Sequence, residues 1–260
     1  MQVLDQLHST GLGSPLLIAG TALAFLAAAI LRGFTGFGFA LVAVPLSSLA
    51  LPPSRSVPIV FLLQLVIGAI DTIRHRRNLD RRFLTIAAVA VIATPVGVYL
   101  LSIAPPGMAR ITIAIIVLVG TLLMWRPPQF PLQPSHGLGT LTGIGVGLCN
   151  GIAAMPGPPA IAYSLLTHMP ADKARSSLMI LFFTTALAGV PSTMAFGIAD
   201  TATLLLAAIA LPIIFLGTYL GAELFRRYGT KTYREVALFT LIGTAIAMII
   251  REMWAITSSL

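Results

Sequence analysis

The stretch RGFTGFGFALVAVP, residues 32–45, interrupts a long apolar segment with closely spaced glycines and a proline. A related stretch, GLCNGIAAMPGPP at residues 147–159, does the same in the second half of the chain. The two align at an offset of 114 residues, which places Gly33 on Gly147. Lipid cannot satisfy the backbone groups that such a break frees, so breaks inside apolar segments are unusual. Paired breaks in the two halves of a membrane chain are typical of a transporter's binding site.

The composition places the chain in the lipid bilayer. Of the 260 residues, 57% are hydrophobic and 9% are charged, whereas soluble domains average about 25% charged residues. The formal net charge of +8 is explained by cationic loops on the cytoplasmic face of a membrane protein. Nucleic acid is excluded as a partner, because the aromatic side chains lie in the apolar segments and not among the basic residues.

Apolar segments follow one another along the chain, and all of them are predicted to be helices, since open strands cannot survive in lipid. They cover residues 15–31, 34–51, 57–73, 83–103, 109–125, 138–149, 151–168, 177–197, 201–221 and 235–255. The segment 138–149 has 12 residues, or roughly 18 Å of helix, which is too short to cross a ~30 Å hydrocarbon layer. We therefore expect it to be part of a re-entrant hairpin or an interrupted crossing.

The basic residues choose between two topologies. If each broken segment enters the membrane and returns, 12 of the 16 Lys and Arg residues lie on one face, three on the other and Arg32 within the membrane. If each broken segment crosses once, the split is 7 to 8. The positive-inside rule selects the first arrangement. Both termini then lie outside, and the second half of the chain is inverted relative to the first.

Short matches along the two halves support a repeat. GVYL at residues 97–100 resembles GTYL at 217–220, although chance similarity among glycine-rich helices is the alternative. The predicted fold is an all-α polytopic membrane protein with two inverted repeats of about five helical segments each. The first segment of each half is interrupted or re-entrant, and the whole chain forms one transport domain. The domain covers residues 1–260, and the two repeats cover about residues 15–125 and 138–255.

Arg32 is the strongest candidate for contact with a substrate. It follows the apolar residues 15–31 and directly precedes Gly33, where we expect a turn deep in the membrane. An unpaired arginine there costs about 3 kcal/mol or more and is usually functional. Its planar fork of donors matches two oxygens of an anion. In the alternative, residues 15–31 cross fully and Arg32 is a topology charge in a cytoplasmic turn.

The remaining candidates surround the two breaks. Glycine permits tight turns and close approach of a ligand, and a helix that begins after such a turn presents free N–H groups and a positive dipole end. Two helix starts that face each other from opposite halves would form an anion site. Packing through small residues is the alternative explanation for the glycines of the second stretch. The candidate substrate-binding residues are Arg32, Gly33, Thr35, Gly36, Gly38, Gln64, Asn150, Gly151, Met155 and Gly157.

Other chemistry finds little support in the sequence. The four histidines lie in loops or at helix ends, without metal-ligand spacing, so neither a metal nor a cofactor is expected. No acid occurs in the middle of an apolar segment, and no nucleophile–base–acid constellation is visible. The chain is therefore predicted not to be an enzyme. The rival classes are a membrane-embedded enzyme that acts on a lipid-linked substrate and a membrane assembly factor without a substrate.

The two broken stretches resemble those of the TauE/SafE family, whose members are described as sulfite or organosulfonate exporters. In each, a glycine-rich turn leads to a proline and then to a helix rich in small residues, and the resemblance extends over about residues 15–255. It implies a small sulfur-containing or organic anion, such as sulfite or sulfoacetate. It also implies export across the inner membrane of a bacterial cell. A homo-oligomer is compatible with this class but does not follow from the sequence.

The topology predicts how single cysteines will react from outside the cell. In a background without Cys149, cysteines at Asn78 and Thr230 should both resist an impermeant thiol reagent. The basic segments that contain them, residues 74–82 and 226–234, are both expected in the cytoplasm. Whole-cell labelling followed by mass measurement tests this. Strong labelling of one of the two positions would restore the topology with single crossings.

Overall fold

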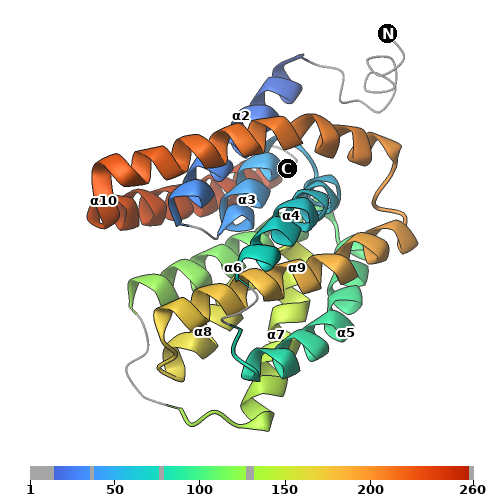
Figure 1. The fold of residues 1–260 in the computed structure, drawn as a ribbon. Helices are drawn as coiled ribbons and strands as arrows, with labels where there is room; N and C mark the ends of the chain where they lie inside the picture. The colour runs from blue at the N-terminus through green and yellow to red at the C-terminus, as the bar shows by residue number, and fades with distance from the viewer. Residues whose placement is uncertain (1–14, 36–37, 76–78, 127–131, 258–260) are drawn as a thin grey trace.

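The computed structural model describes residues 15–35, 38–75, 79–126 and 132–257, and the secondary structure in these ranges is entirely helical. This confirms the predicted all-α class (Figure 1). Five segments are long and apolar enough to span a membrane: Pro53–Ile73, Arg82–Ile103, Pro106–Leu123, Ala171–Ala195 and Thr201–Leu224. The helices are α2 (Pro15–Thr35), α3 (Phe39–Ala50), α4 (Pro53–His75), α5 (Arg82–Ile103), α6 (Pro106–Trp125), α7 (His136–Ala153), α8 (Gly157–Leu166), α9 (Ala171–Ala195) and α10 (Thr201–Thr257).

The two predicted breaks exist, but each falls a few residues later than expected. Helix α2 continues through Arg32 and Gly33 to Thr35, and α3 begins at Phe39 after Gly38. Gly38 has a φ of 87°, a left-handed conformation that glycine adopts without steric cost. The predicted turn at Gly33 is therefore wrong, because Gly33 is a helix residue.

The second break follows Ala153 rather than Cys149. Helix α7 has 18 residues, about 27 Å of helix, so it is longer than the expected 12 residues. It is not among the described segments that are long and apolar enough to span a membrane. Ala154 ends it in the left-handed region with a φ of 52°. The glycines of α7 did not end the helix, because they serve as packing positions against a neighbouring helix.

Two parallel helix pairs pack almost backbone to backbone. Helix α5 lies against α7, and the first part of α10 lies against α2 (Figure 1). A Cβ atom on Gly151 would overlap the carbonyl oxygen of Thr94, and a Cβ atom on Gly33 would overlap that of Thr218. Small residues that permit such close contact are a common basis of helix association in membranes.

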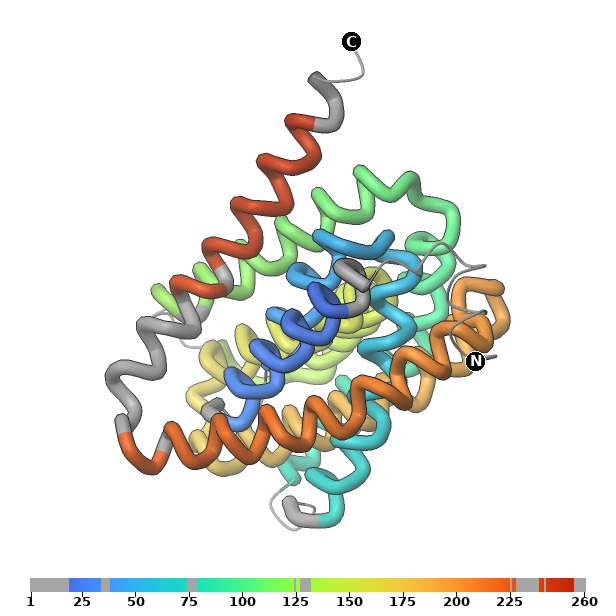
Figure 2. Tube along the Cα trace, turned by 90° about the horizontal axis from the view of Figure 1, so that it is seen from above, coloured from blue at the N-terminus to red at the C-terminus, as the bar shows by residue number. Residues whose placement is uncertain are grey.

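Helix α10 is a single long element where two segments, 201–221 and 235–255, were expected. Its first limb, drawn in orange, and its last limb, drawn in red, run in different directions on either side of α2 (Figure 2). The first limb packs on α2 through Gly217 and Gly221, and the last limb reaches α3 and α6 through Arg251 and Glu252.

The apolar core joins residues from both halves of the chain. Phe25 of α2, Phe61 of α4, Ile113 of α6 and Ile214 of α10 belong to one cluster, and each is at most 1% exposed. Large apolar side chains such as Ile92 are exposed on the outside, as expected for helices that face lipid.

The contact between α5 and α7 predicts the effect of a single methyl group. Gly151→Ala should lower stability by about 1–3 kcal/mol, because the added carbon has no room beside the α5 backbone. Gly137→Ala on the same helix is the control, since nothing lies within 4 Å of its added carbon. Thermal unfolding in detergent measures both, and equal midpoints for the two variants would contradict the packing described here.

Candidate functional site

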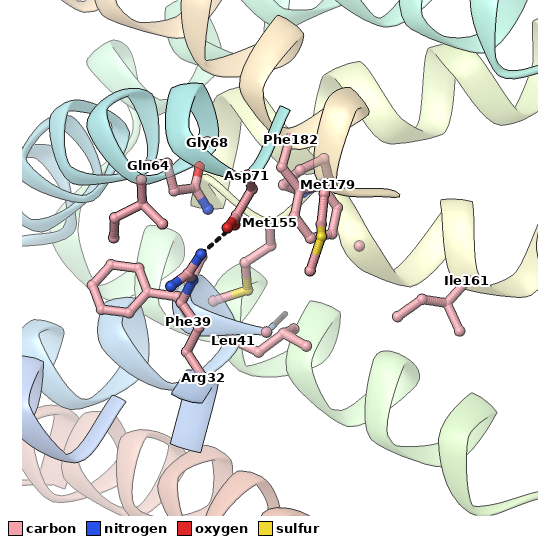
Figure 3. Close-up of a pocket in the computed structure, with 15 residues that line it drawn as sticks. Arg32, Phe39, Leu41, Gln64, Gly68, Asp71, Met155, Ile161, Met179 and Phe182 are labelled. Atoms are coloured by element: carbon pink, nitrogen blue, oxygen red, sulfur yellow. Dashed lines mark hydrogen bonds and ion pairs between the residues drawn. The ribbon is translucent and has the colours of Figure 1, made fainter. Parts of the chain in front are cut away.

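A small cavity lies where the two breaks meet. Its walls come from α2, α3 and α4 of the first half and from α8, α9 and the link before α8 in the second half (Figure 3). Its volume is about 40 Å³, room for about three water-sized spheres. The polar side chains in its wall are those of Arg32, Gln64 and Asp71, and the apolar ones include Phe39, Met155, Met179 and Phe182.

Arg32 forms an ion pair with Asp71 at this cavity. Nη2 of Arg32 on α2 donates to Oδ2 of Asp71 on α4 (Figure 3). The side chains are 11% and 18% exposed, so both charges are largely removed from water. The prediction of an unpaired arginine is therefore wrong. A buried arginine of this kind is held by a counter-ion, because burial of an isolated charge is very costly.

Asp71 was missed by sequence reasoning, although a signal was present. Gln64, Gly68 and Asp71 have the spacing i, i+4, i+7, which places them on one face of a helix, and all three line the cavity. The face therefore carries an amide, a glycine and a carboxylate within an otherwise apolar segment. Only the approach of Arg32, 39 residues away in sequence, shows what the carboxylate does.

Two helices begin at the cavity. Gly38, Phe39 and Ala40 line it at the start of α3, and Pro156 and Gly157 line it at the start of α8. The first N–H groups of a helix have no partner within that helix, and this end carries a partial positive charge. The expected pair of helix starts from opposite halves is thus brought together in one cavity.

The two helix starts are not equal as donors. Pro158 and Pro159 follow Gly157 in the first turn of α8, and proline has no N–H. Helix α3 has no proline in its first turn, although Leu41 donates to the carbonyl of Gly38 at 3.1 Å. The backbone donors available to an anion therefore come mainly from Phe39 and Ala40.

Gln64 connects α4 to the second break. Its Nε2 donates to the carbonyl oxygen of Ala154 at 3.1 Å, the residue with the left-handed backbone after α7. Its Oε1 is buried without a hydrogen-bond partner among the described residues. Gln64 therefore holds the broken segment in place and also supplies an acceptor to the cavity wall.

Other predicted residues have structural contacts away from the cavity. Asn150 is fully buried, and its Nδ2 donates to Oγ1 of Thr94 and to the carbonyl of Thr185, both at 3.2 Å. It lies within the helical turn before the break, so the N–H groups expected from 150–153 are committed to α7. Gly33 and Gly151 pack against α10 and α5.

Half of the predicted set thus lines the cavity. These residues are Arg32, Gly38, Gln64, Met155 and Gly157. Gly36 and the side chain of Thr35 lie outside the described residues.

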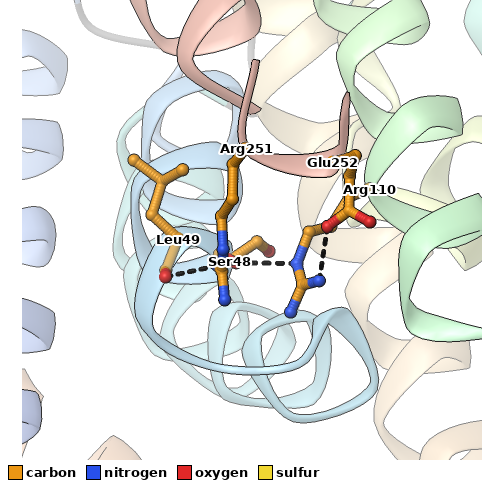
Figure 4. Close-up of polar contacts among 5 residues, drawn as sticks. All are labelled: Ser48, Leu49, Arg110, Arg251 and Glu252. Carbon is orange, nitrogen blue, oxygen red and sulfur yellow. Dashed lines mark hydrogen bonds and ion pairs between the residues drawn. The ribbon is translucent and has the colours of Figure 1, made fainter. Parts of the chain in front are cut away.

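The far end of α3 is held by arginines from both halves. Ser48 presents its carbonyl to Nε of Arg110 at 3.1 Å and to Nη1 of Arg251 at 2.9 Å, and Leu49 also accepts from Arg251 (Figure 4). Glu252 accepts from Nη1 of Arg110 at 2.6 Å. Cations at the last carbonyls of a helix complement its dipole. These contacts anchor α3, whose opposite end forms the cavity wall.

Broken helices that meet at a polar cavity inside an apolar helical bundle define a membrane transporter. The family model described as "Sulfite exporter TauE/SafE" matches residues 21–248, and the chain belongs to this family, as the broken stretches suggested. It is similar to a curated protein of Cupriavidus necator named "Probable sulfite/organosulfonate exporter TauE", with 28% identity over 224 residues. The match covers 83% of this chain and 87% of the relative. No solved structure matches the chain.

The ion pair predicts non-additive effects on stability. Arg32→Gln should destabilise the protein by roughly 3–5 kcal/mol, because it leaves the buried Asp71 carboxylate without its arginine. Asp71→Asn should have a comparable effect, whereas the double variant should be more stable than the sum of the two losses implies. A double-mutant cycle of unfolding in detergent measures the coupling. If the losses of stability in the two single variants add up to the loss in the double variant, the interaction between Arg32 and Asp71 contributes nothing to stability.

Proposed function

We propose that this protein exports a small sulfur-containing or organic anion, such as sulfite or sulfoacetate, and that the cavity at the two breaks is its substrate site. The observation that carries the proposal is the convergence of Arg32 with the starts of α3 and α8. Membership of the TauE/SafE family and the printed name of the Cupriavidus relative support this class of substrate.

Arg32 would bind two oxygens of the anion through its guanidinium fork. In this structure Nη2 of Arg32 donates instead to Oδ2 of the Asp71 carboxylate, which is also an anionic oxygen. The substrate would replace that carboxylate, and the amides of Phe39 and Ala40 would take a remaining oxygen. Exchange of one anionic partner for another keeps Arg32 paired, but it leaves the Asp71 carboxylate in need of water, a proton or another partner.

Two inverted repeats remain part of the proposal, and the order and packing of the helices support them. In each half a broken pair, α2 with α3 or α7 with α8, precedes a long helix, α4 or α9. Two further segments follow, which are α5 and α6 in the first half and the limbs of α10 in the second. Helix α5 packs on α7 of the other half, and α10 packs on α2 in return. The proposed setting is the inner membrane of a bacterial cell, with both termini outside.

The membrane potential favours export of such an anion. Moving one negative charge out of a cell that is negative inside gains about 2.3 kcal/mol per 100 mV. This corresponds to a concentration ratio of about 45-fold, at 1.4 kcal/mol per tenfold. Export therefore requires no other source of energy in principle.

Transport by purified protein in liposomes tests the proposal through Arg32→Lys. Labelled sulfite or sulfoacetate should cross only when the protein is present, and the lysine variant should lose at least tenfold in rate, because a point charge cannot reproduce the fork. Arg55→Lys is the matched control, since Arg55 pairs with Asp200 at 3.6 Å away from the cavity.

Two outcomes would contradict the proposal. Normal transport by a well-folded Arg32→Lys protein would show that Arg32 only sets topology. If no anion crosses and a lipid-linked substrate is modified instead, the protein is a membrane-embedded enzyme.

A further inference from the structure

A second cavity lies at the shared end of α5 and α7, built from residues that do not contribute to the first. Its volume is about 300 Å³. Both helices begin here, α5 at Arg82 and α7 at His136, so two positive helix ends converge on it. The side chains of Arg81, Arg82, His136 and Tyr163 contribute to its wall.

The positive charge at this cavity is only partly balanced. Among the described residues Arg81 forms no ion pair, and the nearest approach of Arg82 to a carboxylate is 3.9 Å, from its Nε to Oδ1 of Asp80. That same oxygen accepts the backbone N–H of Arg82 at 2.9 Å. The side chain of Arg82 is half exposed, so it can turn toward a ligand at low cost.

Tyr163 adds a hydrogen-bond donor to the wall of this cavity. It is 3% exposed, and its ring packs edge-on against Phe83 at 5.9 Å between centroids. No described residue forms a hydrogen bond with its hydroxyl, which belongs to a side chain that lines the cavity. The hydroxyl opens on the cavity, where it can donate to an anionic oxygen held beside the two arginines.

We infer that this cavity binds the phosphate of an anionic phospholipid headgroup. The surfaces of α5 and α7 next to it carry exposed apolar side chains, including Leu84 at 54% and Leu141 at 69%, which acyl chains would cover. A soluble phosphate would leave these surfaces without a partner. Basic cavities between helices on the cytoplasmic side are suited to lipid headgroups, and the placement on that side rests on the proposed topology.

Lipid titration of the full chain in uncharged detergent micelles tests the inference. Phosphatidylglycerol should raise the unfolding midpoint of the wild type, whereas phosphatidylcholine should not. The variant R81Q/R82Q should need at least ten times more phosphatidylglycerol for the same shift. Tyr163→Phe, which removes only the hydroxyl, should weaken the effect by a smaller factor.

The matched control is R226Q/R227Q, which removes the same number of charges from exposed side chains that pair with Glu223. This control should respond to phosphatidylglycerol as the wild type does. If its response falls as much as that of R81Q/R82Q, the stabilisation comes from general surface charge, and the proposed site is overturned. Glycerol phosphate that stabilises the wild type as strongly as the lipid would overturn the lipid assignment in favour of a soluble anion. Since the assay measures binding, its failure leaves the transport proposal untouched, and failure of transport by the wild type leaves the lipid site untouched.

Discussion

A helix that ends inside an apolar layer leaves backbone groups that only the protein can satisfy. This constraint explains the side-chain hydrogen bonds that reach the ends of the broken helices. The last carbonyls of α3 accept from Arg110 and Arg251, and the carbonyl of Ala154 accepts from Gln64. The starts of α3 and α8 are arranged differently, because they lie at a cavity beside a buried arginine. The ends of the broken helices thus divide into those that hold the structure and those that form the candidate site.

The class, the positions of most helices and the pairing of the two breaks could be predicted because they depend on local patterns of apolar residues, glycine and proline. The last residue of each helix at the breaks could not. Gly33 and Gly38 are equivalent by local propensity, yet Gly33 packs inside α2 and Gly38 forms the turn. The choice between them depends on Thr218 of α10, which the sequence does not place beside Gly33.

The residues of the candidate site, like the helix ends, could be predicted only in part. Arg32 and Gln64 were predicted because polar side chains within apolar segments require partners. Asp71 was not, because its position near the end of α4 made solvent or lipid headgroups an adequate environment. Asn150 was placed in the site because an amide at an interrupted helix suits contacts with a ligand or with the backbone, a capping role being the alternative. Its partners are Thr94 and Thr185. A buried polar residue indicates that a partner exists without indicating which one.

The two cavities use the same elements, helix starts and arginine, at different depths. Arg32 is 11% exposed and already holds a carboxylate, whereas the side chain of Arg82 is 50% exposed and only loosely paired. Screening by water and salt is weak at the first and strong at the second. Under the two proposals, discrimination between anions would depend on exchange with Asp71 at the inner cavity, and on the attached apolar chains at the outer one.

The backbone contacts of α5 with α7 and of α2 with α10 have a mechanical consequence. Glycine contacts this close prevent one helix from sliding along its neighbour, so we expect each pair to move as one rigid body. The inner cavity is bounded on one side by Arg32 of α2, which belongs to one body, and on the other by Met155 and Pro156 in the link that follows α7 of the other body. If the cavity is the proposed substrate site, its alternating exposure to the two faces of the membrane would require the two bodies to rock against each other over α4 and α9.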